Sequence, residues 1–596
     1  MLRTWLMGRA PQTSLAFFAV VFALTAIGCA KTDRAGSTDS TASSTQAAST
    51  VACASDNGGI TLPAGFCATV FADSLGHPRD IVIAANGDAY VNTWSGRYYG
   101  EDPLPPGGFL VALQDTKGAG KADVVRRFGD TADAGGTGGT GLAIFDGKLY
   151  AEAGDRIVRY TLDDGSPVPQ GAPEVVISGL TTSGEHPMHP FAIAADGKLY
   201  VDVASATNTC QKKNRELESA GREPCKELES RGGVWQYDAN RTGQAFSPAE
   251  RFATGIRNAG SIAVDAAGRV FATQHGRDQL AENWPKLYTP EQGATQPAEE
   301  LLQLEKGANF GWPHCYFDSG QGKRVLAPEY GGDGGKSVGL CAERRAPVAA
   351  YPAHWAPTGL AFYEGAQFPA RYRGGAFIAF HGSWNRAPFQ QDGYKVVFQP
   401  FADARAEPGC EIFADGFAGS VRSPEGAAHR PTGLAVAPDG ALYISDDVKG
   451  RIYRVTYAGA VGASGEQPRV ACPNPAAPPV VEPPISEDLS GLAPPQGYDK
   501  DTVLLGSRLY HAESGTAACA GCHGAQATGT ALGPDLVDAE WLWSDGSVKG
   551  IAKTIRDGVP EPRKHRNPMP AMGGAPMTVE QVTAIAAYLR ALSDAR

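Results

Sequence analysis

One short pattern recurs six times between Cys53 and about residue 457, and it limits the possible folds more than any other feature of the chain. Each copy is an alternating apolar run that ends at a turn glycine and leads into a second apolar run, as in a β-hairpin. The copies occupy residues 81–87, 142–147, 191–197, 262–268, 360–365 and 434–440. A β-sandwich would not repeat one hairpin six times. The sequence therefore predicts an all-β domain, a six-bladed β-propeller, over residues 53–458.

Four of the copies carry a basic residue eleven positions before the turn glycine, namely His186, Arg257, His354 and His429. Equivalent positions of propeller blades converge around the central axis at one end. Any one of these side chains alone would be an ordinary polar residue on the rim. Four cationic groups together repel one another unless an anion lies among them. The repeat therefore predicts an anion-binding ring, and a redox cofactor with several carboxylates fits it.

A short run near the C-terminus predicts a covalently attached haem. Cys519 and Cys522 are separated by two residues, and His523 follows directly. In this c-type attachment signal the two thiols add to the haem vinyl groups and the histidine binds the iron. A disulfide or a zinc pair is the alternative, but zinc would need two further ligands at matching spacing. The motif indicates a protein that moves electrons.

The residues after this motif are typical of a small helical haem domain. A Pro-rich loop offers Met569, or as second choice Met572, as the sixth iron ligand, and His/Met ligation raises the haem potential. Thr578 and Gln581 form a capping signature before a run with helical apolar spacing. Residues 498–596 resemble class I cytochrome c domains, so we expect an all-α domain here.

The N-terminus reads as an export signal. Residues 1–28 combine two arginines with an apolar stretch that is too short for a comfortable bilayer span. The segment ends at Cys29 in a run that resembles a bacterial lipobox, which predicts a lipid-anchored protein on the periplasmic side of the membrane. A plainly secreted protein is the alternative. Residues 29–52 are rich in Ser, Thr and Ala and are expected to form a flexible tether.

The cysteine content agrees with export. Without Cys29 and the haem pair, eight of the eleven cysteines remain, an even number that suggests disulfides. Pairing of sequence neighbours would give 53–67, 210–225, 315–341 and 410–472. We expect the first two closures and leave the other two open, because connectivity cannot be read from a sequence.

Two further features describe the organisation of the chain. Residues 459–497 are rich in Pro and Ala and predict a semi-rigid linker that holds the haem domain near the propeller. The net charge of −11 over 596 residues argues against a nucleic-acid partner.

Several stretches of the propeller resemble a known family. The clearest are residues 255–258, 274–278 and 307–313, which read Gly-Ile-Arg-Asn, Gln-His-Gly-Arg-Asp and Gly-Ala-Asn-Phe-Gly-Trp-Pro. With the motifs around residues 184–187, 353–357, 381–386 and 430–435, they make residues 60–457 similar to the quinoprotein glucose/sorbosone dehydrogenases. Members of that family bind pyrroloquinoline quinone (PQQ) in a six-bladed propeller, and a cytochrome fused behind it also occurs in the group.

The resemblance implies a role for each candidate residue. His186 stands where the family keeps its general base, and Arg257 would stabilise negative charge that grows on the quinone oxygen. The remaining PQQ contacts that we expect are Asn258, His354, Arg386, His429 and Arg430, with Arg430 gripping a carboxylate. The family's calcium ion would bind backbone carbonyls at Gly276 and Arg277. The acidic pair Glu299 and Glu300 is either part of the site or a solvated charge pair.

The sequence thus predicts a PQQ-dependent dehydrogenase of the sugar or sorbosone type. It would oxidise an aldose or a related alcohol or aldehyde and pass electrons to its own haem c. A downstream cytochrome or a respiratory-chain acceptor would then receive them. A different class of function is a non-catalytic propeller that binds a partner and docks an electron-carrying cytochrome to it.

Overall fold

The computed structural model describes residues 56–93, 106–129, 139–163, 165–386, 389–403, 405–422, 424, 426–459, 469–479, 489–511, 519–524, 526–529, 533–538, 540–563, 568–574 and 577–595. The expected export signal, the anchor Cys29, the tether and Cys53 lie outside these residues and stay predictions. Within the described part of the chain, no helix is both long and apolar enough to cross a lipid bilayer.

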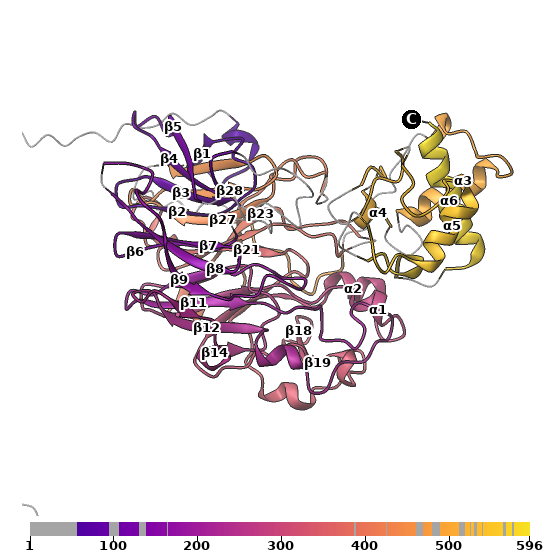
Figure 1. Ribbon diagram of the computed structural model, residues 1–596, viewed down its shortest axis with the longest axis horizontal. Helices are drawn as coiled ribbons and strands as arrows, with labels where there is room; N and C mark the ends of the chain where they lie inside the picture. Colours follow the sequence, from indigo (N-terminus) through magenta and orange to yellow (C-terminus); the bar gives the residue numbers. More distant parts are fainter. Residues whose placement is uncertain are drawn as a thin grey trace, which may run out of the picture. The chain divides into compact units, whose positions relative to one another are not determined.

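Six antiparallel sheets form the predicted propeller within the described residues (Figure 1). The first blade contains β2 (Pro78–Ile83), β3 (Ala89–Thr93), β4 (Leu110–Gln114) and β5 (Val124–Phe128), and the second contains β6 (Leu142–Phe145), β7 (Lys148–Ala153), β8 (Arg156–Thr161) and β9 (Glu174–Ser178). The third contains β10 (Phe191–Ile193), β11 (Lys198–Val203), β12 (Gly233–Asp238) and β14 (Arg251–Thr254), and the short β13 (Gln244–Ala245) joins the second blade beside β9. The fourth contains β15 (Ile262–Val264), β16 (Val270–Gln274), β17 (Glu299–Leu304) and β20 (Ala349–Tyr351). The fifth contains β21 (Pro357–Phe362), β22 (Ala376–Phe380), β23 (Lys395–Gln399) and β26 (Glu411–Ala414).

The sixth blade closes the ring with a strand from the start of the domain. It contains β27 (Pro431–Val436), β28 (Leu442–Asp446) and β29 (Arg451–Tyr457), and β1 (Phe66–Ala72) pairs with β29 as its outer strand. On the inner side, the Thr432 hydroxyl donates to the Pro78 carbonyl of the first blade at 3.0 Å. The first strands of neighbouring blades contact one another, which places them next to the central axis.

Consecutive residues of these strands are apolar because each blade is buried on both faces. Neighbouring residues of one strand face different neighbours: Leu149 packs with the first blade, whereas Tyr150 packs with the third. In β22, Phe377 likewise packs toward the sixth blade and Ile378 toward the fourth. Six apolar cores between adjacent blades therefore hold the propeller together, rather than one central core.

The fourth blade carries two insertions that lie together in Figure 1. One contains the short helices α1 (Leu280–Asn283) and α2 (Pro290–Thr295), and the other contains the hairpin β18 (Cys315–Asp318) and β19 (Lys323–Leu326). Their apolar side chains, including Leu280, Tyr288 and Val325, share one buried cluster. The smaller elements of the propeller are β24 (Phe401–Ala402), β25 (Arg405–Ala406), η1 (Asn57–Gly59), η2 (Lys226–Glu229), η3 (Pro248–Glu250), η4 (Pro328–Tyr330), η5 (Gly339–Glu343) and η6 (Ala370–Tyr372).

Three disulfides are formed among the described residues. The predicted pair Cys210–Cys225 is confirmed, and Cys315–Cys341 and Cys410–Cys472, which the sequence left open, are present as well. The Cys410–Cys472 disulfide bears on the predicted linker, because it joins the Pro-rich segment to the fifth blade next to its outer strand. The Ile412 amide also donates to the Val470 carbonyl at 2.7 Å. Residues 469–479 are therefore attached to the propeller and do not act as a free spacer.

The C-terminal domain is all-α, as predicted. It contains α3 (Lys500–Tyr510), α4 (Cys519–His523), α5 (Val548–Asp557) and α6 (Val579–Asp594), together with the short turns η7 (Leu489–Gly491) and η8 (Ala571–Gly574). The predicted capping box at Thr578 and Gln581 is confirmed. Gly506 lets α3 approach α6 closely, since a Cβ there would lie 2.0 Å from the Ala584 carbonyl oxygen.

Candidate functional site

A cluster of polar side chains gathers where the inner strands of the propeller begin and the second strands end. In an antiparallel blade these two positions lie at the same edge, so six blades bring them to one end of the axis. We call this group the polar cluster; its members are Arg79, His186, Arg257, His275, Asp278, His354, His381, Arg386, Arg430 and Asp447. Electrostatic interactions connect its members across the blades.

Arg257 is the most constrained member. Its guanidinium donates to the Asn208 carbonyl at 3.2 Å, to the Gly276 carbonyl at 2.9 Å and to the Asp278 carboxylate at 2.8 Å. The same Asp278 oxygen also accepts from Arg215 at 2.8 Å, and Arg215 forms a fork with Glu185. Burial works in the opposite direction, yet Arg257 and Arg215 hold the pKa of Asp278 well below its usual range. A charged Asp278 is thus the counter-ion of two guanidinium groups.

His186 lies beside Arg257 as a neutral imidazole. Its Nδ1 lies 2.9 Å from the Ser205 carbonyl, which can only accept, so Nδ1 carries the proton. Nε2 is therefore the nitrogen with the lone pair. Burial first, and then the charge of Arg257, lower the pKa of His186 to about 3. Nε2 therefore carries a lone pair that can accept a proton, and the low pKa makes this imidazole a weaker base than a free one.

Three other histidines of the polar cluster are neutral for similar reasons. His275 donates from Nε2 to the Pro357 carbonyl at 2.9 Å, and its Nδ1 accepts from Asn258 at 3.3 Å. His354 donates to the Gly293 carbonyl at 2.9 Å and accepts from Asn385. Burial lowers the pKa of His275 and of His354 to about 4 and that of His381 to about 3. The expected ring of positive imidazoles is therefore a ring of neutral ones, and arginines carry the charge.

A second carboxylate lies among the basic groups on the other side of the axis. Asp447 accepts from Arg79 at 2.6 Å and contacts His381 Nε2 at 2.9 Å with both oxygens. These residues come from the first, fifth and sixth blades. The sequence predicts a bound ligand as the source of the negative charge between the basic groups. The protein supplies part of that charge itself, through Asp278 and Asp447.

Two guanidinium groups have only carbonyl oxygens as hydrogen-bond acceptors among the described residues. Arg430 donates to the carbonyls of His381 and Gly382 at 2.9 and 2.7 Å, and Arg386 donates to those of Ala353 and Gln390. Among the described residues, neither forms an ion pair with a carboxylate within 4 Å. Carbonyl oxygens orient a guanidinium without cancelling its charge, so an anionic ligand fits at these two side chains.

His429 is not part of the polar cluster. Its Nδ1 pairs with Asp446 at 2.8 Å, and its ring lies against Tyr453 in the core of the sixth blade. The spacing to the turn glycine does not account for this difference. The last paired residue of the inner strand lies four positions before the glycine in the third, fourth and sixth blades, but three positions before it in the fifth. The fifth blade is therefore the one whose count departs, yet its His354 belongs to the polar cluster and His429 does not.

The expected calcium position does not fit a metal site made by the protein. Within the described residues, no group of three or more His, Cys, Asp or Glu side chains could hold a metal ion. The Gly276 carbonyl already accepts from Arg257, and the Arg277 guanidinium is buried in an ion pair with Glu329 at 2.7 Å. Calcium takes six to eight oxygen ligands, and of the two expected backbone carbonyls, those of Gly276 and Arg277, the first is already engaged by Arg257.

The acidic pair that the sequence left undecided is buried rather than solvated. Glu299 accepts from the amides of Gly276 and Ala356, and Glu300 accepts from Arg324. Burial raises the pKa of Glu299 to about 8, so its carboxyl is largely protonated at neutral pH. Glu299 supports the backbone beside the polar cluster, whereas Glu300 binds the side chains of Gln274 and Arg324.

Sequence reasoning missed the residues that balance and support the cluster. Asp278 and His381 stood inside the quoted motifs, but Arg79, Arg215 and Asp447 had no signal of their own. Arg215 lies 63 residues from Asp278, which belongs to the next blade, and Arg79 lies 368 residues from Asp447. Closure of the ring brings Arg79 and Asp447 together.

The haem-attachment residues are arranged to receive the prosthetic group. Cys519 and Cys522 are not joined in a disulfide, and both lie on α4. His523 Nδ1 donates to the Pro534 carbonyl at 2.9 Å, which leaves Nε2 as the nitrogen that can bind iron. Met569, which pairs through its backbone with Val559, and Met572 both pack against the apolar cluster that includes Cys519.

Known proteins resemble both domains. A family model described as TrAA12-like matches residues 60–458, and one described as cytochrome c matches residues 503–593. An uncharacterized protein of Borreliella burgdorferi is 29% identical over 212 residues, which cover 35% of this chain and 49% of that protein. A pyrroloquinoline quinone-dependent pyranose dehydrogenase of Coprinopsis cinerea is 29% identical over 227 residues, 33% of this chain and 30% of that protein. The matches thus span less than half of these curated relatives.

Solved structures share the propeller fold. A calcium-containing structure of a Trichoderma reesei protein of the carbohydrate-active enzyme family AA12 has a TM-score of 0.52 at 20% identity and covers 67% of this chain and 97% of its own. The holo PQQ domain of the Coprinopsis pyranose dehydrogenase has a TM-score of 0.51 at 18% identity, with the same coverage. At this identity the likeness establishes the fold alone.

Proposed function

The chain belongs to the TrAA12-like family and carries a C-terminal cytochrome c domain, and from this we propose that it is a quinohaemoprotein oxidoreductase. It would oxidise a sugar, or a related alcohol or aldehyde of the aldose or sorbosone type, with PQQ. It would then pass electrons to a covalently bound haem c. The observation that carries the proposal is the polar cluster, in which a neutral His186 lies beside Arg257 while Arg386 and Arg430 lack carboxylate partners.

The donor set fits a ligand with several carboxylates. Arg430 and Arg386 would hold carboxylates of PQQ, because both are oriented by carbonyls and neither is paired with an acid. Asn258 and Arg257 would face the quinone end. When bound, PQQ would supply a quinone that accepts a hydride from an alcohol carbon.

His186 would take the hydroxyl proton of the donor as the hydride leaves. The hydrogen bond from Nδ1 to Ser205 fixes the tautomer, so that Nε2 receives this proton. Burial, and then the charge of Arg257, would keep the imidazole unprotonated before the reaction, and Arg257 would place a fixed cation where negative charge develops. His354 would act by orientation, since both of its ring nitrogens are already engaged.

The cytochrome domain would remove the electrons one at a time. Cys519 and Cys522 would hold the haem covalently, His523 would bind one side of the iron, and Met569 the other. A soluble cytochrome or a respiratory-chain component would be the next acceptor. We further propose that the protein is exported and anchored at Cys29, which suits oxidation of sugars outside the cytoplasm.

The test follows the haem itself. Purified protein, loaded with haem and incubated with PQQ, is mixed with aldoses, other pyranoses and sorbosone, and the reduced haem bands are recorded. We expect reduction that needs both PQQ and one class of sugar. Dithionite reduction serves as the control for an intact haem domain. Failure of PQQ to bind would leave the non-catalytic binding module as the better account.

Substitution of the proposed base gives a sharper test. His186→Gln keeps a side chain that can donate to Ser205 but lacks the basic Nε2. We expect sugar-driven haem reduction to fall by about 100-fold or more, with dithionite reduction and PQQ binding unchanged. Turnover at the wild-type rate would show that another group accepts the proton.

A further inference from the structure

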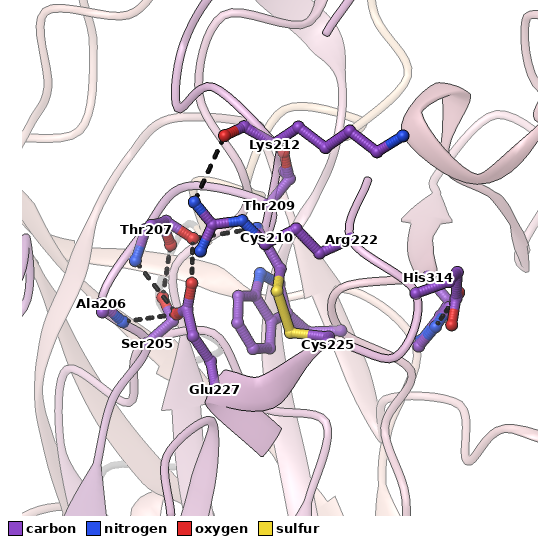
Figure 2. Close-up of a disulfide and its surroundings, with 12 residues drawn as sticks. Ser205, Ala206, Thr207, Thr209, Cys210, Lys212, Arg222, Cys225, Glu227 and His314 are labelled. Carbon is purple, nitrogen blue, oxygen red and sulfur yellow. Dashed lines mark hydrogen bonds and ion pairs between the residues drawn. A yellow bond between two sulfur atoms is a disulfide. The ribbon is translucent and has the colours of Figure 1, made fainter. Parts of the chain in front are cut away.

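The loop between β11 and β12 supports three residues of the polar cluster from one side. It contains η2 and is closed by the Cys210–Cys225 disulfide, shown in Figure 2. Ser205, at its start, accepts from His186. Three residues further along, Asn208 contacts both Arg257 and Asp278. The loop thus reaches groups that belong to the third and fourth blades.

Asn208 is fully buried, and each of its polar groups has a partner. Its side chain binds the Asp278 backbone at two points: Oδ1 accepts from the amide at 3.0 Å and Nδ2 donates to the carbonyl at 2.9 Å. Its own carbonyl accepts from Arg257 at 3.2 Å and from the Trp312 indole at 3.0 Å. Its amide donates to Asn214. This one residue therefore sets the distance between the Arg257 guanidinium and the Asp278 backbone.

The surroundings of Asn208 hold it in place. Glu227 accepts from the amides of Ala206 and Thr207 at 2.8 and 3.2 Å and from the Thr207 hydroxyl at 2.5 Å, contacts that lie beside the disulfide in Figure 2. The Cys210 amide donates to that hydroxyl at 2.9 Å. Cys210 has a φ of +52°, a backbone conformation that a non-glycine residue keeps only when its surroundings enforce it. The disulfide packs against Trp312, which is itself bonded to Asn208.

We propose that Asn208 is the positioning residue of the polar cluster and that the Cys210–Cys225 disulfide keeps it there. Asn208 fixes Arg257 and Asp278 relative to His186, without touching a substrate or a cofactor. The kinetic part of this proposal rests on the proposed function, whereas the geometric part concerns the apoprotein alone.

The apoprotein offers a direct test through His186. The charged groups that act on this imidazole are Arg257, Glu185 and Asp278, and Arg257 has the largest effect after burial. In Asn208→Ala the backbone carbonyl still accepts from Arg257, but the two side-chain bonds that fix the Asp278 backbone are lost, so the positions of the Arg257 and Asp278 charges relative to the imidazole change. We expect the titration midpoint of His186, followed by NMR of ¹³C-labelled histidine and assigned with His186→Gln, to shift by about one pH unit or more.

Asn283→Ala is the matched control. Asn283 is also a buried amide in this region; it donates to the Arg215 carbonyl at 3.1 Å and contacts neither Asp278 nor Arg257 through its side chain. This variant should lose stability to a similar extent and leave the His186 titration unchanged. Replacement of both cysteines by alanine, Cys210→Ala with Cys225→Ala, should shift the titration in the same direction as Asn208→Ala.

Steady-state kinetics distinguishes a loss of positioning from a loss of folded protein. Asn208→Ala should lower kcat for sugar-driven haem reduction by about 10- to 100-fold and change KM by less than about threefold, because misplacement of the reacting groups lowers the rate more than substrate binding. An unchanged His186 titration in Asn208→Ala, or equal effects in Asn283→Ala, would overturn the proposal. If no sugar reduces the wild-type haem, the proposed function fails, and the titration still decides the role of Asn208.

Discussion

Replacement of Asp278 by asparagine should reveal how far the polar cluster depends on its own carboxylates. One Asp278 oxygen accepts from Arg257 and from Arg215 at 2.8 Å. Arg215 would keep its fork with Glu185 in Asp278→Asn, but Arg257, whose side chain is only 5% exposed, would lose its counter-ion. Leaving a buried charge unpaired costs about 3–5 kcal/mol. Because Asp278 is 20% exposed, we take the lower end, about 3 kcal/mol.

This free energy translates into a measurable melting shift. A propeller of roughly 400 residues has an unfolding entropy of about 0.8 kcal/mol per kelvin, so Tm should fall by about 3–4 °C. Circular dichroism of the β-sheet signal follows the propeller separately from the haem domain. Asp439→Asn is the control, since its pair with Arg454 lies at the surface and should contribute less than about 1 kcal/mol. Equal Tm values for the two variants would refute the view that Asp278 neutralises the cluster.

Three further predictions concern pH, metal and haem. His354 has its pKa lowered to about 4 by burial, so the stability it contributes is complete above its unfolded pKa of about 6.5 and is lost as the pH falls toward 4. The stability difference between wild type and His354→Asn should therefore shrink by about 1.4 kcal/mol per pH unit across that range, as measured by urea unfolding; a constant difference would contradict the neutral imidazole. Because the Gly276 carbonyl is engaged by Arg257, dialysis against EDTA before PQQ is added should leave sugar-driven haem reduction within about twofold, and a loss that Ca²⁺ restores would show that a metal completes the site. Met569→Ala should lower the haem reduction potential by more than about 100 mV in a redox titration, whereas Met572→Ala should leave it unchanged; the reverse result would exchange their roles.

The fold was predictable because its signals are local. The repeated hairpins, the haem motif and the Thr578 capping box each occupy a few consecutive residues, and the structure confirms the six blades and the capping box. The fifth hairpin differs from the prediction, because β21 ends at Phe362 and β22 begins only at Ala376 rather than directly after Gly365. The placement of site residues was less predictable than the blades themselves. His429 has the same spacing to its turn glycine as His186 and Arg257, yet it pairs with Asp446 in the sixth blade and does not join the cluster.

The charges at the site were less predictable than its residues. Histidines counted as positive in the sequence are neutral, because burial next to arginines lowers the pKa of His186 and His381 to about 3. Asp447 and Arg79, which pair at 2.6 Å, are 368 residues apart in the chain. A local sequence pattern predicts neither the burial of a histidine nor an ion pair between residues so far apart in the chain.

The sequence alone determined the number of blades, the order of the two domains and the chemical types gathered at the propeller axis, since these depend on periodicity and on short motifs. The tertiary structure decided which of those groups are charged and which are already paired. A protonation state depends on solvent exposure and on the distance to neighbouring charges, and both quantities exist only after the first and last blades have met.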